Sequence, residues 1–170
     1  MNYYLLFFFI LTSCSRSYET EASVNDVHDQ LSVDVEITLT EKGNIKALIK
    51  SNLLERNDNN LELKLTDNVN VDLYDDNYQH SSLITSNYAF VSETENKINA
   101  FGDVIVAADN GQQLWTDSLL WDNKADKIFT NASLTFISAN LDTLYGTGFE
   151  SNIDLTNWKI TKPRGSINNE

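Results

Sequence analysis

Apolar and polar residues alternate along most of the chain, most clearly from Leu83 to Phe136, where one pattern occurs twice. Each copy has an apolar segment, a polar turn and a second segment, 97–106 or 127–136, with apolar or small residues at every other position. A period of two is typical of β-strands. The copies align at Leu83 with Leu114, Tyr88 with Leu119, Lys97 with Lys127, and Val104 with Leu134. A repeat of about 30 residues predicts a unit that stacks on copies of itself.

Turn signals separate the alternating segments. Asp109-Asn110-Gly111 lies between the two copies, and Asn-Gly supplies the positive φ angles of a tight hairpin. Alternation over 33–39 and 45–50 predicts an earlier hairpin with its turn at 41–44, and 61–65, 69–74, 141–150 and 157–160 predict further strands. Gly146 and Gly148 share one face of a strand, which indicates a bend or a close backbone approach. We therefore predict an all-β fold, an antiparallel twisted β-jelly roll of repeated hairpins that is open at both ends.

The start of the chain has the pattern of an export signal. Leu5 to Leu11 is a continuous apolar run of about 10 Å as a helix, too short for a membrane core of about 30 Å. Leu11-Thr12-Ser13-Cys14 is similar to a bacterial lipobox, in which the cysteine is acylated, and Cys14 is the only cysteine. We predict a lipoprotein signal peptide over 1–13, a flexible tether over 14–32, a β-domain over 33–165 and a C-terminal tail over 166–170.

Two alternatives stay open at this end. The segment also fits an ordinary signal peptide with an incidental cysteine. Positions 1–4 carry no Lys or Arg, so either the amino terminus supplies the positive charge of the signal or the true start lies upstream. An acylated Cys14 would hold the protein in the cell envelope through buried acyl chains.

Charge excludes one class of partner. The formal net charge is −13, from 25 acidic and 12 basic residues. Such a chain repels a phosphate backbone, which argues against a nucleic-acid partner. The same charge disfavours polybasic contact with anionic lipid head groups, so any lipid that the protein handles is held by its tails.

The search for catalytic residues gives weak candidates. His28 and His80 are too few for a metal site and are expected to be solvated loop residues. Asp117 and Asp122 flank one predicted strand and fit a glycosidase pair, but aspartate at hairpin ends also serves turn geometry. We predict a protein that is not an enzyme and needs no cofactor or metal.

The apolar face of the sheet is the remaining candidate site. Apolar residues of the two copies are predicted to line a hydrophobic interior that binds lipid chains. The alternative is that they only form a packed core. These residues are Val104, Val106, Leu119, Trp121, Ile128, Leu134 and Phe136. The last strand, around Trp158 and Ile160, is predicted to offer an edge to which a partner's strand is added.

The sequence resembles the LptC family of lipopolysaccharide-export proteins over roughly Ser32 to Gly165. The resemblance rests on Phe101-Gly102-Asp103-Val104, Leu114 to Asp122, Lys127-Ile128, Tyr145 to Ser151, and Trp158. It implies a periplasmic jelly roll that accepts lipopolysaccharide acyl chains from an inner-membrane ABC transporter with LptF-like and LptG-like subunits. It also implies transfer of these chains to an LptA-like periplasmic protein.

The chain departs from the better-known members of this family, which are held by a transmembrane helix. The expected anchor is instead the acylated Cys14, on the periplasmic side of the envelope, with the inner membrane favoured because the family works there. Two rival functions remain. One is a scaffolding lipoprotein that assembles partners edge to edge without binding lipid, and the other is a jelly-roll enzyme or glycan binder that acts through Asp117 and Asp122.

Overall fold

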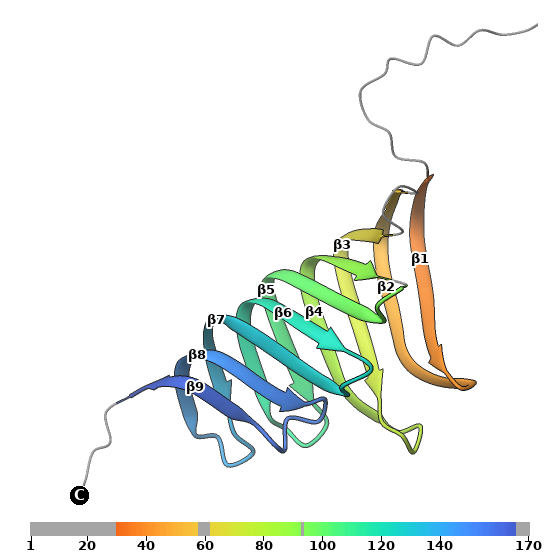
Figure 1. Cartoon of the computed structure of the whole chain (residues 1–170). Helices are drawn as coiled ribbons and strands as arrows, with labels where there is room; N and C mark the ends of the chain where they lie inside the picture. The colour runs from red at the N-terminus through yellow and green to blue at the C-terminus, as the bar shows by residue number, and fades with distance from the viewer. Residues whose placement is uncertain (1–29, 58–61, 93, 166–170) are drawn as a thin grey trace, which may run out of the picture.

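The computed structural model describes residues 30–57, 62–92 and 94–165, which form one antiparallel sheet (Figure 1). The spatial order of its nine strands is their order in the sequence, and the sheet stays open because β1 and β9 each pair with one neighbour. The predicted all-β antiparallel fold is therefore confirmed. The strands are β1 (Gln30–Glu41), β2 (Asn44–Asn57), β3 (Glu62–Tyr74), β4 (His80–Ser92), β5 (Lys97–Ala108), β6 (Gln113–Asp122), β7 (Lys127–Ile137), β8 (Thr143–Asn152) and β9 (Lys159–Arg164).

Short turns join neighbouring strands, as the sequence predicted. Lys42 and Gly43 both have positive φ, 52° and 86°, which is the two-residue hairpin geometry that matches strand twist. In the β5–β6 turn only Gly111 has positive φ, 89°, and its N–H donates to Ala108 O at 2.9 Å. The sequence predicted a positive φ at both Asn110 and Gly111. Asn110 does not have one, because the turn has three residues and the glycine is the last of them.

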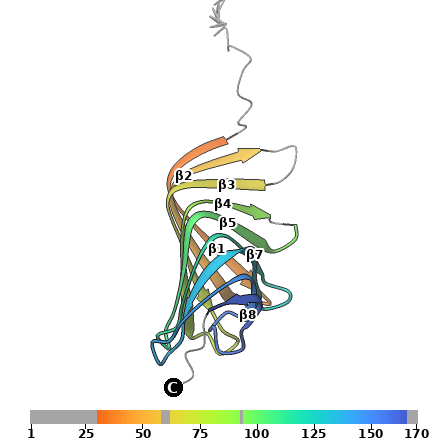
Figure 2. The same cartoon turned by 90° about the vertical axis from the view of Figure 1, so that its left-hand side faces the viewer.

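Every interior strand bends near its middle, so that the two halves of the sheet face each other (Figure 2). Register shifts mark these bends, for example between Thr66 and Val69 in β3 and between Phe101 and Val104 in β5. Left-handed residues occupy the bend, Asp67 and Asn68 in β3 and Gly102 and Asp103 in β5. A bulge with such residues turns a strand sharply, and repetition across the sheet folds it into a jelly roll.

Buried hydroxyl groups form hydrogen bonds at the bends of β2, β4 and β6. Ser51 Oγ donates to Thr66 O at 2.7 Å, Ser86 Oγ to Tyr88 O at 3.2 Å, and Thr116 Oγ1 to Ser133 O at 3.0 Å. A bulge frees carbonyl groups from the strand ladder, and a freed carbonyl that is buried needs a donor. These three side chains provide it.

The core lies between the two halves of the sheet. Along each half, buried and half-buried or exposed residues alternate, as in β7, where Ile128 and Thr130 on one side of the bend and Leu134 and Phe136 on the other point inward. Antiparallel sheets with one buried face show this pattern. Leu144 of β8 is half-buried against the same core.

Three details of the sequence analysis are wrong. The predicted alignments of Leu83 with Leu114 and of Tyr88 with Leu119 are wrong, because Leu83 and Tyr88 are not buried whereas Leu114 and Leu119 are. The buried residues that match are Ile84 with Leu114 and Ala89 with Leu119. A slip of one residue reverses the face of every side chain. The segments predicted as 61–65 and 69–74 belong to one bent strand, β3, although Leu61 lies outside the described residues.

The terminal strands also differ from those predicted. β1 begins at Gln30, inside the stretch predicted as tether, and β9 runs to Arg164 instead of ending at Ile160. Pro163 is compatible with β9 because this is an edge strand. The predicted signal peptide, Cys14, His28 and the C-terminal tail lie outside the described residues.

Candidate lipid-binding interior and edge strand

All seven residues predicted to line the interior are in the core, at most 5% exposed. Both halves of the sheet contribute. Val104, Val106, Leu134 and Phe136 come from one half, and Leu119, Trp121 and Ile128 come from the other. The structure therefore brings the predicted set into one apolar interior.

Between β5 and β7 this interior is filled by large side chains. Trp121 and Phe136 are the largest of the fully buried side chains, and the ring of Phe136 packs against Phe149 with a centroid distance of 5.4 Å. An acyl chain cannot enter this part without displacing side chains, since protein interiors are close-packed. Two buried polar atoms on the inward faces of β4 and β6, Ser82 Oγ and Trp121 Nε1, have no hydrogen-bond partner among the described residues.

The interior is more accessible at the end formed by β1. Val35, Ile37 and Leu39 point inward but are only half-buried, because no strand lies beyond β1 to cover them. Leu31 and Val33, at the start of the same strand, are more than 60% exposed. An apolar chain can therefore contact the interior from this end without first displacing Trp121 or Phe136.

The opposite end carries the predicted partner edge. Trp158, which directly precedes β9, is 38% exposed, and its ring lies 4.9 Å from that of Phe136. Ile160 packs against the core over Gly146. The remaining side of β9 is cationic, with Lys159, Lys162 and Arg164 exposed to solvent. β9 thus combines an unpaired backbone edge with an apolar inner side and a basic outer side.

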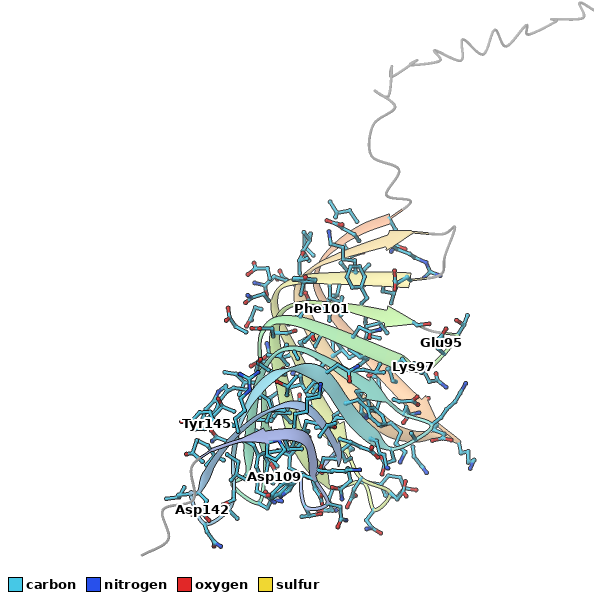
Figure 3. The ribbon with its side chains drawn as sticks, turned by 60° about the vertical axis from the view of Figure 1, so that its left-hand side comes forward. Glu95, Lys97, Phe101, Asp109, Asp142 and Tyr145 are labelled. Carbon is cyan, nitrogen blue, oxygen red and sulfur yellow. The ribbon has the colours of Figure 1, made fainter. Side chains whose placement is uncertain are left out.

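The outer face of the sheet has a groove that the sequence analysis did not anticipate. The groove, of about 530 Å³, runs across β5 to β9 and is lined by Ile105, Trp115 and Tyr145 with Asp117 and Arg164. Tyr145 points away from the interior and is 52% exposed (Figure 3). The strand register explains the groove, because Trp115, Thr135 and Tyr145 are successive cross-strand neighbours on the outer side.

The turns that follow the odd-numbered strands form one row, and the turns that follow the even-numbered strands form another. Charged groups gather where these two rows approach each other, at an opening that we call the mouth of the roll. Lys46 is almost fully buried and forms an ion pair with Asp76, and this hydrogen bond raises the pKa of Lys46. Burial raises the pKa of Asp126, and the nearby carboxylates of Asp76 and Asp154 act in the same direction while Lys46 opposes them. The mouth therefore holds carboxylates at an energetic cost that the lysine offsets only in part.

His80 is not the solvated loop residue that the sequence analysis expected. It opens β4, half-buried, with Nδ1 2.9 Å from Asp109 Oδ1 and Nε2 3.3 Å from Asp72 Oδ1. The ring also meets Tyr74 edge-on. His80 therefore ties the β3–β4 hairpin to the β5–β6 turn. Within the described residues, no group of three His, Cys, Asp or Glu side chains is arranged to hold a metal ion.

Asp117 and Asp122 have separate structural settings. Asp122 Oδ1 accepts hydrogen bonds from the backbone N–H groups of Lys124 and Ala125, at 3.0 and 3.2 Å, and so caps the β6–β7 turn. Asp117 is exposed at the bend of β6 and lines the outer groove. The turn geometry accounts for Asp122, as aspartate commonly does at such positions.

These observations define the class of the protein: a single antiparallel sheet folded as an open β-jelly roll around an apolar interior, with an edge strand at each end. The chain belongs to the LptC-related family of lipopolysaccharide-assembly proteins, whose family model matches residues 4–163. Proteins of this family serve lipopolysaccharide transport in the cell envelope and are not catalysts. No individual curated protein matches the sequence. Among the described residues, no helix is long and apolar enough to cross a membrane.

Proposed function

We propose that the protein binds the acyl chains of lipopolysaccharide in its interior and transfers them without catalysis. The observation that carries this proposal is the continuous apolar core, which both halves of the sheet line and which is incompletely covered at β1. Each Å² of acyl surface removed from water contributes about 25 cal/mol, so the tails supply the affinity and the polar head remains at the mouth. Membership of the family supports the choice of lipid.

The two ends of the roll suggest the direction of transfer. β1 begins at Gln30, inside the stretch predicted as tether, so the more open end lies nearest the membrane and an LptF/LptG-like transporter. β9 lies at the far end, where Trp158 and Ile160 would meet the edge strand of an LptA-like protein by strand addition. We further propose that Cys14 is acylated and holds the protein on the periplasmic side of the inner membrane. Loss of acyl labelling in Cys14→Ser is the expected result.

A photo-crosslinking amino acid tests the lipid proposal in living cells. We place it at Ile37 and Phe136, which point inward, and at Thr38 and Thr135, which are their outward-facing neighbours. Lipopolysaccharide adducts are expected at the two inward positions alone. The same residue at Lys162, on the outer side of β9, should capture the LptA-like partner.

One observation favours a second function, a scaffold that assembles partners edge to edge without lipid. The interior around Trp121 and Phe136 is filled, as in an ordinary core. In that case the folded and exported protein would give no lipid adducts at Ile37 or Phe136, while Lys162 would still capture a protein.

A further inference from the structure

The loop between β8 and β9, residues 153–158, places apolar side chains in the core. Ile153 is 4% exposed and Leu155 is fully buried. Loops normally follow the surface, and these two side chains are inserted where the two halves of the sheet come together. The loop therefore covers part of the mouth of the interior.

Turns from the other half of the sheet meet this loop. A cavity of about 340 Å³ at the mouth is lined by Asp109 and Asn110 of the β5–β6 turn, by Asp126, and by loop residues that include Asp154 and Thr156. Figure 3 shows Asp109 in the lower part of the roll, and Asn152, the last residue of β8, lines the same cavity. The loop thus bridges the two rows of turns at the end of the roll nearest β9.

Internal hydrogen bonds make the loop a compact unit. Asp154 Oδ1 accepts from the N–H and the hydroxyl of Thr156, at 3.0 and 2.7 Å. Asn152, at the end of β8, donates to Thr156 Oγ1 at 3.0 Å and accepts from the N–H of Asn157 at 2.9 Å. These bonds need nothing from the opposite half of the sheet. The loop can therefore keep its shape while it moves about its two ends.

Its polar attachment to the opposite half is slight. Among the described residues, one hydrogen bond crosses the mouth to this loop, from Asn110 Nδ2 to Asp154 O at 2.6 Å. Leu155, the buried anchor, has a φ of 60°, a conformation that costs free energy in a residue other than glycine. Release of the loop would expose the apolar interior beneath it.

On the basis of the proposed lipid-binding function, we propose that this loop is a lid over the interior. Ile153 and Leu155 occupy space in the interior. When the lid opens, an acyl chain takes this space, so one apolar group replaces another. Such an exchange keeps the interior dry, so it removes little hydrophobic stabilisation. The latch is the hydrogen bond from Asn110, and the ends of the loop at Asn152 and Trp158 are its hinges.

Hydrogen exchange of the full chain, followed by mass spectrometry, tests the lid in the absence of lipid. Asn110→Asp removes the Nδ2 donor but keeps the Oδ1 atom that accepts from the N–H of Gln112, so the β5–β6 turn is retained. Asn70→Asp is the matched control, because Asn70 makes its hydrogen bonds on the outer side of β3. We expect amides 153–158 to exchange faster than those of β8 in the wild type, and about five- to tenfold faster again in Asn110→Asp alone.

If amides 153–158 exchange as slowly as the core strands in both proteins, the loop opens only with global unfolding and the lid is overturned. Addition of purified lipopolysaccharide then separates the two proposals. Slower exchange in β5–β7 with faster exchange in the loop supports both. Slower exchange in β5–β7 with an unchanged loop rejects the lid and keeps the binding function. No protection of β5–β7 rejects the binding function and with it the lid's role in lipid entry.

Discussion

Single hydroxyl groups at the bends of β2, β4 and β6 have a larger structural effect than their positions in the sequence suggest. Thr116 is 7% exposed, and its Oγ1 lies 3.0 Å from Ser133 O and 3.3 Å from Thr130 Oγ1. A polar residue at this place in a strand usually indicates the wet face. Here it faces inward, on the same side of β6 as Leu114, and its hydroxyl donates to a carbonyl group of the neighbouring strand.

Replacement of Thr116 by valine, which keeps the shape and removes the hydroxyl, tests this role. We expect the free energy of unfolding to fall by about 0.5–1.5 kcal/mol, because Ser133 O loses the hydrogen bond from this buried hydroxyl. Urea denaturation gives the value. Thr135→Val, the same change on the outer side of β7, should shift stability by less than about 0.5 kcal/mol. Equal effects at both sites would contradict the role assigned to the hydroxyl.

At the scale of elements, β9 is held to the sheet by close contact over two glycines. A Cβ atom on Gly146 would clash with Ile160 Cγ2 and lie 2.9 Å from Lys162 O, and Gly148 has a φ of 79°. The sequence predicted a bend or a close approach here, and the structure has both. The element that makes the approach, β9, was not predictable, because contacts between strands depend on register.

Gly146→Ala should therefore displace β9. We expect the loss of about 1–3 kcal/mol of stability that overpacking causes, together with faster amide exchange in 159–164 and weaker capture of a partner at Lys162. Gly165→Ala is the control, since nothing lies within 4 Å of its added Cβ. Unchanged β9 exchange in the Gly146→Ala variant would show that the strand tolerates the extra methyl group.

For the whole molecule, the acidic mouth links stability to pH. Partial desolvation, together with the nearby carboxylates of Asp76 and Asp154, raises the pKa of Asp126 in the folded state. Its charged form therefore opposes folding, weakly because the residue remains in contact with solvent. This cost is present when the carboxylate is ionised in both states, and it vanishes below about pH 4, where the carboxyl is protonated in both. The carboxyl therefore lowers stability as the pH rises from that value through its raised pKa.

Asp126→Asn should raise the urea midpoint at pH 7, with the gain shrinking to nothing near pH 4. Asparagine suits the site because Asp126 has a φ of 51°, a conformation that asparagine tolerates. Asp142→Asn makes the same change of net charge in the exposed β7–β8 turn. If Asp142→Asn gave the same gain, the effect would come from net charge and not from burial at the mouth.

The sequence by itself determined the strands, most of their turns and the inward face from Ile98 to Phe136, because these depend on alternation and on residues adjacent in the chain. Tertiary structure decided what depends on distant residues. The bends shift the alternation, so Leu83 and Tyr88 do not occupy the places of Leu114 and Leu119. The packing of the β8–β9 loop over the mouth arises only once the sheet folds over and brings Asn110 and Asp154, 44 positions apart, together. The contact of His80 with Asp109 and the outer groove at Trp115 depend on the register of neighbouring strands.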